Sequence, residues 1–525
     1  MQVALGLLFT AVGRAIALSP HGAACLTPST ASLPFCDSSQ PTAFRIADLI
    51  SRLSLSEKIG LSGTLPNSDS CAGLDAGVSR LDIPALSNLI ECTGAVSSNC
   101  VVDTDGSSYC PTVFPSPLAV AASFNRSLMR LRGAVTGMEA RAFNNLHTNR
   151  LGGNPVDLLA FGPDLNLIVD PRNGRNGENP SEDPFLAGVY AEEYVRGAQE
   201  SDDDPHRLQL AMSLKHFAGY QKETGRLSSD FNFSLFDLVD TYLPPFARGF
   251  SKGKAVGTMC SYNSLNGIPA CADSWLLRDM PAFWGRPDAV HMSDCGAVEN
   301  QYEQKHTAAS YADATAQSIK AGTDWCMGTS FTTHTGLSDA LAQGLIAPAD
   351  LDAALARTLS LRFRLGLFDA PPHASPLTAY GVERIGSTSS RQAAEAAAAQ
   401  GAVLLRNNGA VLPLRLSNIS ALAVVGPHAV SQRELLGDFY GDAFCPGNNT
   451  PGRAVDSCVP TLGGSIADLC ANLRRDVEVV IAEGVGFVGN DTSGMAAALA
   501  AVEQVDVVVL AVGYSNKNVR ALNLL

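Results

Sequence analysis

The sequence lacks several features that would assign it to common functional classes. After the N-terminus it has no long, uncharged apolar segment, so a membrane-spanning helix is not predicted. None of its 13 cysteines forms a C-x-x-C pair, which argues against a zinc site or a thioredoxin motif. It contains no Gly-x-Ser-x-Gly elbow and no convincing cluster of metal ligands. Basic residues are also few: 37 Lys and Arg face 51 Asp and Glu, and the net charge of -14 argues against nucleic acid or an anionic membrane as partner.

The N-terminus and the cysteines point to secretion. The segment "MQVALGLLFTAVGRAIALS" holds an apolar run too short to span a bilayer, followed by an A-x-A cleavage pattern, so residues 1–17 are predicted to be a signal peptide, with a buried helix as the alternative. The short loops from Cys260 to Cys271 and from Cys445 to Cys458 suit disulfides. N-x-S/T sequons agree with an extracellular glycoprotein and begin at Asn125, Asn232, Asn418, Asn448 and Asn490.

Apolar β-rich runs alternate with helix-like segments in the first two thirds of the chain. The runs are "LLAFGPDLNLIVD", "LQLAMSLKHF", "AVGTMCSYN", "DAVHMSD" and "AGTDW", and they end in polar residues: Asp170, Lys215 with His216, Tyr262 with Asn263, Asp294 and Asp324. Such alternation predicts an α/β fold with a parallel sheet covered on both faces. An open doubly wound sheet fits the pattern, but the length of residues 33–365 favours a (β/α)8 TIM-like barrel, whose reactive groups stand at the carboxyl ends of strands.

A second α/β pattern follows a Pro-rich linker over residues 366–389. The helix "RQAAEAAAAQGAVLL" leads to the strands "ALAVVG", "VEVVIAEG" and "VDVVVLAVG", so residues 390–525 are predicted to form a partial α/β sandwich domain. Within it, Gly484, Gly486 and Gly489 satisfy G-x-G-x-x-G. Because the next strand carries no acidic residue to hold a ribose, we interpret these glycines as a turn and expect no cofactor.

Several polar residues at the predicted strand ends are candidates for chemistry. Asp294, in "VHMSDCGAV", is either a nucleophile or a helix cap. Lys215 and His216 either bind the hydroxyl groups of a neutral sugar or form a buried structural pair. Arg172, in "VDPRNGRNGENPSEDP", is either a substrate-binding residue or the ion-pair partner of a nearby acid: Glu178, Glu182 or Asp183.

Ten segments in order, from about Leu33 to Gly513, resemble glycoside hydrolase family 3, most closely its fungal-type β-xylosidase branch. They include "LPFCD", "TVFPSPLAVAASFN", "GMEARAFNN", "FGPDLNLIVDPRNGRNGENPSEDP", "LKHFAGYQ", "MCSYNSLNGIPAC", "MSDCGAV" and "AVLLRNNGAVLPL". The resemblance implies a secreted retaining exo-glycosidase, most similar to a xylan 1,4-β-xylosidase that releases xylose from the non-reducing ends of xylo-oligosaccharides. A β-glucosidase or an α-L-arabinofuranosidase of the same family, and a catalytically impaired sugar-binding relative, are the alternatives.

The same resemblance implies roles for individual residues. Asp294 would be the nucleophile that forms a covalent glycosyl-enzyme. Tyr262 would lie beside it, and three residues would bind the hydroxyls of the cleaved sugar: Arg172, Lys215 and His216. Glu91, in "LSNLIECTGAV", falls where xylosidases carry a sugar-binding Glu, although the aromatic pair and the "ALHG" expected around it are missing. By analogy, a disulfide from Cys295 to Cys326 would brace the nucleophile strand, with two buried thiols as the alternative.

The acid/base carboxyl group of a retaining glycosidase is not found where the resemblance places it. In that branch a Glu follows the strand that matches "VDVVVLAVG", whereas here "YSNKNVRALNLL" contains neither Glu nor Asp. Three interpretations stay open: a C-terminally truncated sequence, which we favour, a catalytically impaired chain, or a substitute carboxyl from the barrel such as Glu299 or Glu303.

Overall fold

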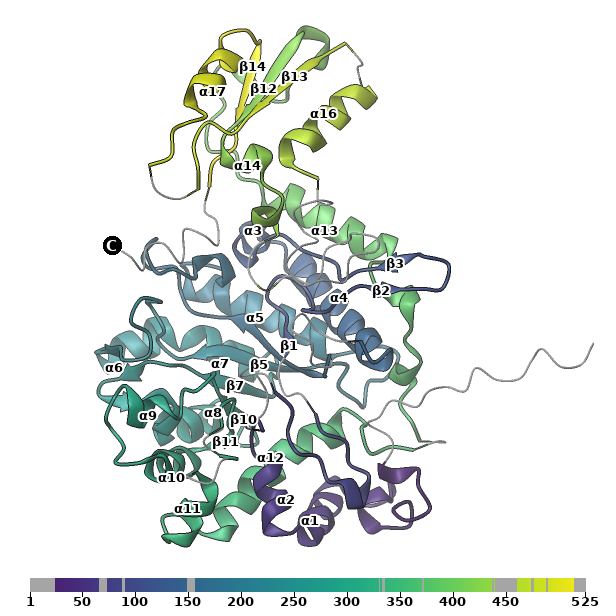
Figure 1. Cartoon of the computed structure of the whole chain (residues 1–525), viewed down its shortest axis with the longest axis vertical. Coiled ribbons are helices and arrows are strands. Elements are labelled where there is room, and N and C mark those ends of the chain that lie inside the picture. Colours follow the sequence, from purple (N-terminus) through teal and green to yellow (C-terminus); the bar gives the residue numbers. More distant parts are fainter. Residues whose placement is uncertain are drawn as a thin grey trace, which may run out of the picture.

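The computed structural model describes residues 24–65, 73–86, 90–148, 156–329, 331–332, 336–370, 373–436, 439, 460–473, 476–487 and 490–513. Within these ranges the buried apolar residues form one large cluster, from Ala24 to Ala397, and two small clusters between Ile419 and Ala511. Figure 1 shows the corresponding larger unit and, above it, a smaller unit. The predicted signal peptide (residues 1–17), the predicted Cys445–Cys458 bond, the Asn448 sequon, Gly489 and the tail after Gly513 lie outside the described residues.

A parallel sheet of six strands runs through the larger unit in the order β1-β4-β5-β7-β10-β11. The strands are β1 (Ile90–Glu91), β4 (Leu159–Asp164), β5 (Ala211–Phe217), β7 (Gly257–Cys260), β10 (Val290–Ser293) and β11 (Thr323–Trp325). A parallel bridge between Gly63 and Cys326 continues the sheet beyond β11. The predicted α/β organisation with a parallel sheet is therefore confirmed. The described residues contain six strands in this sheet.

Strand β4 ends at Asp164, earlier than the predicted end at Asp170. The Asp164 side chain accepts a hydrogen bond from the backbone N–H of Asn166 at 3.0 Å, a local turn that competes with continuation of the strand. Strand β5 is buried along its whole length, as expected for a central parallel strand. Strand β7 depends on Gly257, because a Cβ there would lie 1.7 Å from the carbonyl oxygen of Val290 in β10.

Helices surround this sheet (Figure 1). They are α1 (Thr42–Arg52), α2 (Leu55–Gly60), α3 (Pro117–Ala122), α4 (Arg126–Asn145), α5 (Pro184–Gln199), α6 (Leu235–Asp237), α7 (Pro244–Ser251), α8 (Met280–Phe283), α9 (Asn300–Glu303), α10 (Tyr311–Ala321), α11 (Leu337–Ala342), α12 (Pro348–Arg364) and α13 (Thr388–Gly401). Helix α5 begins where the Asp183 side chain caps the N–H of Phe185, with Pro184 in the first turn. Glycines let α4 and α5 approach closely: a Cβ at Gly133 would lie 2.1 Å from the carbonyl oxygen of Tyr194.

Two minor β elements flank the large sheet. A hairpin consists of β2 (Val101–Val102) and β3 (Ser108–Tyr109). A three-stranded sheet consists of β6 (Asp230–Phe231), β8 (Ser264–Leu265) and β9 (Ile268–Pro269), and it brings the loop before β6 next to the loop after β7. This sheet thereby positions two segments that the candidate site uses.

The smaller unit has a parallel sheet in the order β13-β12-β14. Its strands are β12 (Ala421–Val425), β13 (Glu478–Ala482) and β14 (Val507–Leu510), accompanied by helices α14 (Pro427–Val430), α16 (Leu462–Leu473) and α17 (Met495–Val502). Gly484, which has a φ of +77°, follows β13 in a segment without helix or strand, where the sequence predicted a turn. Helix α13 packs on α3 and α4 of the larger unit, so the proposed domain boundary near residue 390 stays a prediction.

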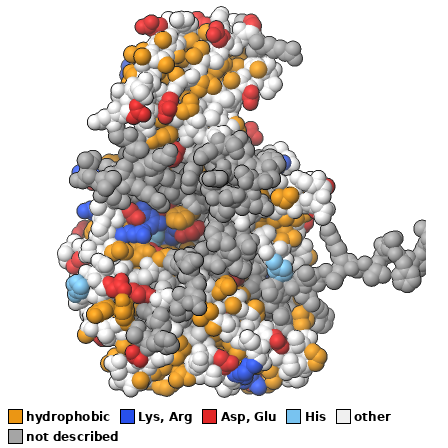
Figure 2. Space-filling model, viewed as in Figure 1, with side chains coloured by type: hydrophobic (Ala, Val, Ile, Leu, Met, Phe, Trp, Pro, Cys, Tyr) orange, Lys and Arg blue, Asp and Glu red, His pale blue; other side chains and the backbone are white. Residues whose placement is uncertain are grey.

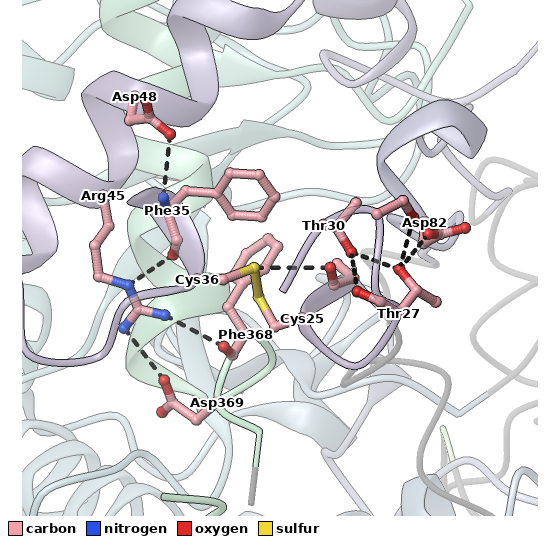
Figure 3. Close-up of a disulfide and its surroundings, with 12 residues drawn as sticks. Cys25, Thr27, Thr30, Phe35, Cys36, Arg45, Asp48, Asp82, Phe368 and Asp369 are labelled. Carbon is pink, nitrogen blue, oxygen red and sulfur yellow. Dashed lines mark hydrogen bonds and ion pairs between the residues drawn. A yellow bond between two sulfur atoms is a disulfide. The ribbon is translucent and has the colours of Figure 1, made fainter. Parts of the chain in front are cut away.

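Disulfides fasten local segments of the larger unit. They join Cys25 to Cys36, Cys100 to Cys110 and, as predicted, Cys260 to Cys271. Figure 3 shows the first of them: next to Cys36, the carbonyl of Phe35 accepts from the Arg45 guanidinium of α1, which also pairs with Asp369 beyond α12 at 3.2 Å. This contact ties the segment around Cys36 to the chain that follows α12.

No helix among the described residues is both long and apolar enough to cross a membrane.

Candidate functional site

Asp294 begins the loop after β10, at the carboxyl edge of the parallel sheet. Its backbone N–H donates to the carbonyl of Cys260, and its Oδ1 accepts from the N–H of Cys295 at 2.7 Å. Asp294 is 5% exposed, and its Oδ2 has no hydrogen-bond partner among the described residues. A buried carboxylate oxygen without a partner is costly unless something fills the site, so this atom marks the place where a ligand would bind.

A cluster of buried charges lies at the same edge, centred on Lys215 of β5. The Lys215 Nζ is 2.7 Å from Glu91 Oε2 and 3.2 Å from Glu178 Oε2, and the lysine side chain is fully buried. Arg175 completes the cluster through two contacts with Glu178, at 2.6 and 2.9 Å. Two cations and two carboxylates thus share one buried site and together offer hydrogen-bond donors and acceptors.

The charges in this cluster shift each other's pKa values. Burial alone would lower the pKa of Lys215, but the carboxylates of Glu91 and Glu178 outweigh burial and raise it. Burial would raise the pKa of Glu178, yet Arg175 and Lys215 lower it to about 2. For Glu91 burial dominates, and its pKa is raised although Lys215 acts against this. The cluster therefore keeps Lys215 and Glu178 charged at neutral pH.

His216 connects this cluster to Asp294. Its Nε2 is 3.8 Å from Asp294 Oδ2, and its Nδ1 is 3.2 Å from both Asp164 Oδ2 and Asn166 Oδ1. The Asn166 side chain also donates to the backbone carbonyl of His216 and accepts from its backbone N–H. These two bonds fix the His216 backbone and thereby the position of its ring. Burial, reinforced by the charge of Glu178, raises the pKa of Asp164 to about 7.

We expect the His216 imidazole to stay neutral from about pH 5 to 8, the range in which an ordinary histidine changes charge. Burial, together with the charges of Arg175 and Lys215, lowers its pKa well below the usual value, so the proton is lost at a more acidic pH. The test uses D164N, because the Asp164 carboxyl beside Nδ1 has a pKa of about 7 and would itself shift the signal. NMR of D164N labelled at histidine Cε1 would show no inflection for this residue, with its signal assigned through the loss of one peak in D164N/H216Q. An inflection between about pH 6 and 7 would contradict the expectation.

Tyr262 lies two positions beyond β7 and is 4% exposed. Its phenol faces Asp294: burial and then the negative charge of Asp294 raise its pKa above the usual range, while Arg226 acts in the opposite direction. The phenol therefore keeps its proton and presents a donor beside the carboxylate.

The structure does not bring Arg172 into the cluster, in contrast to the other residues singled out from the sequence. Its side chain is 80% exposed and pairs with Asp170 at 2.6 Å, rather than with any of the three acids considered. The reason is local: the Asp170 side chain accepts both from the backbone N–H and from the guanidinium of Arg172, which holds the arginine on the surface. Arg175 takes the buried position instead.

The predicted disulfide between Cys295 and Cys326 is wrong. Cys295 is disulfide-bonded, but Cys326 keeps its thiol. Cys326 is buried directly after β11, with its sulfur 3.6 Å from the hydroxyl of Ser293 and 4.0 Å from Glu299, whereas Cys295 lies half-buried in the loop beyond β10.

Sequence reasoning missed several residues near the site. Asp164 could have been found, since it ends an apolar strand as Asp294 does. Glu178 was considered only as a partner of Arg172. Phe439 gave no signal: its ring lies 4.4 Å from Lys215 Nζ, and its carbonyl accepts from the N–H of Ala95, contacts that cross hundreds of residues of chain.

The described residues contain no group of three or more His, Cys, Asp or Glu side chains arranged to hold a metal ion. The carboxylates of the cluster are instead directed at Lys215, Arg175 and His216.

Charged side chains also reach the surface of the larger unit. Figure 2 shows basic and acidic side chains gathered in a hollow of this unit.

Comparison with known families classifies this chain. Residues 105–361 match the glycosyl hydrolase family 3 N-terminal domain. Within this range the chain is therefore a glycosyl hydrolase family 3 N-terminal domain, as the sequence motifs indicated. The matched range contains Asp294, Lys215, His216, Arg175 and Tyr262.

Its relatives are named as xylosidases. A beta-xylosidase/alpha-L-arabinofuranosidase from Medicago sativa subsp. varia is 35% identical over 471 residues, which are 86% of this chain and 58% of the relative. An exo-1,4-beta-xylosidase from Emericella nidulans is 33% identical over 94% of this chain and 60% of the relative. The chain thus spans less than two thirds of the length of these relatives.

Solved structures show the same fold. A family 3 exo-beta-xylosidase (XlnD) in complex with a xylobiose aziridine probe aligns with a TM-score of 0.80 and 31% identity, over 94% of this chain and 59% of that one. A beta-glucosidase from Listeria innocua in complex with isofagomine aligns with a TM-score of 0.70 and 28% identity, over 92% and 65% of the two chains.

Proposed function

We propose that this chain carries the nucleophile and the sugar pocket of a retaining exo-glycosidase, a xylan 1,4-β-xylosidase that removes xylose from the non-reducing ends of xylo-oligosaccharides. The observation that carries the proposal is the buried Asp294 Oδ2, which has no hydrogen-bond partner among the described residues and lies 3.8 Å from His216 Nε2, at the edge of a cluster of buried polar groups. The family 3 N-terminal domain and the xylosidase names of the relatives support it. The parallel sheet with its helices would be the (β/α)8 barrel, and the second sheet would belong to an α/β sandwich domain.

The cluster is suited to a neutral sugar with several hydroxyl groups. In the proposal, Lys215 and Arg175 donate to hydroxyl oxygens, Glu91 accepts from a hydroxyl group, and the neutral His216 imidazole faces the ring carbon that Asp294 attacks. Because Lys215 is fully buried, it would close the end of the pocket, which favours cleavage from a chain end. The donors of Lys215 and Arg175 are already held in place by their ion pairs. A sugar hydroxyl can therefore bind to them with little further desolvation of these side chains.

The proposed reaction has two displacements. Asp294 Oδ2 attacks the anomeric carbon, the bond to the leaving oxygen breaks, and water later displaces the carboxylate with overall retention. An activated leaving group such as dinitrophenolate departs as an anion, whereas a sugar leaving group takes its proton from solvent water, and the water of the second displacement returns a proton to solvent. Of the two barrel carboxyls considered from the sequence, Glu303 is exposed and accepts from the hydroxyl of Tyr311, and Glu299 lies against Cys326.

The proposal also includes secretion and glycosylation of the protein.

The test traps the covalent intermediate. The chain is incubated with a dinitrophenyl β-xyloside carrying a 2-fluoro group, whose leaving group departs without an acid and whose fluorine slows the second displacement. Peptide mass spectrometry should find one pentosyl group on Asp294. The matching glucoside and arabinofuranoside serve as parallel probes, because one relative is also named as an arabinofuranosidase. An adduct on another residue, or none with any of the three sugars on folded protein, would refute the proposal.

A further inference from the structure

Arg226 stands next to the candidate site but is not part of the buried cluster. It lies in the loop between β5 and β6, and its guanidinium carbon is 4.4 Å from the centroid of the Tyr262 ring. One third of its side chain is exposed, whereas Tyr262 and Asp294 are almost fully buried. Asp294, Tyr262 and Arg226 therefore form a series that leads from the buried carboxylate to the surface.

Glu223 holds the guanidinium in this place. Its Oε1 lies 3.0 Å from Arg226 Nη1, and its Oε2 accepts from the hydroxyl of Tyr220 and lies 4.0 Å from Arg175 Nη1. Glu223 is the carboxylate that pairs with Arg226 in the part of the chain that the structure describes. A guanidinium has five N–H donors, so this pairing leaves donors for another ligand.

The geometry points to Arg226 as the residue that recognises the leaving-group sugar, through hydrogen bonds from its guanidinium to the hydroxyl groups of the second sugar of the substrate. This inference rests on the proposed function. If Asp294 Oδ2 meets the anomeric carbon, the sugar to be released lies toward the buried Lys215. The rest of the substrate must then extend toward the exposed side, which Tyr262 and Arg226 line.

Stacking on Tyr262 makes the guanidinium a rigid donor. A lysine at this position would keep the charge but lose the planar contact with the ring and the fork of donors. Arg226 should therefore matter for the binding of a disaccharide and hardly at all for the binding of a monosaccharide. This difference separates a contact with the second sugar from a general structural role.

The experiment measures protection against trapping at Asp294. The 2-fluoro dinitrophenyl xyloside labels the full chain in the presence of increasing xylose or xylobiose, and the concentration that halves the labelling rate is recorded for each. In R226M that concentration should rise about tenfold for xylobiose, the loss of a charge-assisted hydrogen bond, and stay unchanged for xylose. R226K should show about a threefold rise for xylobiose. R196M, which removes a comparably exposed paired arginine from α5, should behave as the wild type.

Each outcome bears on the inference separately from the proposed function. No labelling of the folded wild-type chain by the xyloside, the glucoside or the arabinofuranoside would overturn both. Normal labelling with an unchanged ratio of xylobiose to xylose protection in R226M would overturn this inference alone. An equal loss of protection by both sugars would assign Arg226 to the support of Tyr262 and would also overturn it. If R226M does not fold, as circular dichroism would show, the ratio measured in R226K decides.

Discussion

Replacing Asp294 by alanine should lower the release of dinitrophenolate from a dinitrophenyl β-xyloside by about 10⁴-fold or more, because the variant lacks the group that forms the covalent intermediate. The activated leaving group makes the rate report the first displacement without help from an acid. Loss of a carboxylate that has one open oxygen should leave the fold intact, which a thermal melt would check. Stopped-flow absorbance gives the rate of the first turnover.

The control removes a nearby carboxylate of a different kind. Glu303 is exposed on α9 and accepts from the hydroxyl of Tyr311 at 2.6 Å, so E303Q should release dinitrophenolate at the wild-type rate. A tenfold fall in E303Q would reopen the possibility that this residue takes part in the reaction.

Adding azide to D294A tests the same prediction through the configuration of the product at the anomeric carbon. In D294A a small anion can enter the space of the missing carboxylate and displace the leaving group directly. One displacement inverts the anomeric carbon and two displacements retain it, so the product should be the α-xylosyl azide. A β-xylosyl azide would mean that another side chain still forms the covalent intermediate, and Asp294 would then not be the nucleophile.

The sequence predicted the parts of the site that depend on strand ends. Lys215, His216 and Asp294 each follow or end an apolar run, and parallel strands bring their carboxyl ends to one edge. The structure indeed places Asp294 Oδ2 at 3.8 Å from His216 Nε2. The spacing of apolar residues along a strand is a local property of the sequence. The strand ends, and the polar residues placed there, could therefore be predicted from the sequence.

Loops were less predictable, as the two arginines of "PRNGRNGEN" show. Motif similarity favoured Arg172, but side-chain turns decide which arginine faces inward. Asp170 holds Arg172 at the surface, and the short helix Asn176–Glu178 brings Glu178 back to Arg175. Such turns depend on single hydrogen bonds and leave no periodic trace in the sequence.

Long-range contacts were the least predictable. Phe439 reaches Lys215, and Arg226 reaches Tyr262, through loops whose paths are set by the packing of distant elements. The disulfide of Cys295 shows the same limit: a pairing with Cys326 was suggested by analogy, yet the side-chain direction at Cys326, toward Ser293, excludes it.

Replacing Lys215 by methionine should destabilise the larger unit by about 3–5 kcal/mol, the cost of breaking a buried ion pair from one side. The Lys215 side chain is fully buried between Glu91 and Glu178, and without it Glu91, whose side chain is only 14% exposed, is left as a carboxylate whose main counter-charge is gone. Urea unfolding followed by fluorescence measures the change. K58M, which breaks the more exposed pair with Asp352, should cost at most about 1 kcal/mol.

A double variant separates the cost of the uncompensated charge from the loss of sugar binding. K215M/E91Q removes the carboxylate that lost its partner, so it should recover about half of the lost stability, because a neutral amide is cheaper to bury than an ion. It should not recover labelling of Asp294 by the 2-fluoro xyloside, since the donor and the acceptor proposed for the sugar hydroxyls are both changed. Full labelling in the double variant would show that the cluster only supports the fold, and wild-type stability in K215M would show that Glu91 finds another partner.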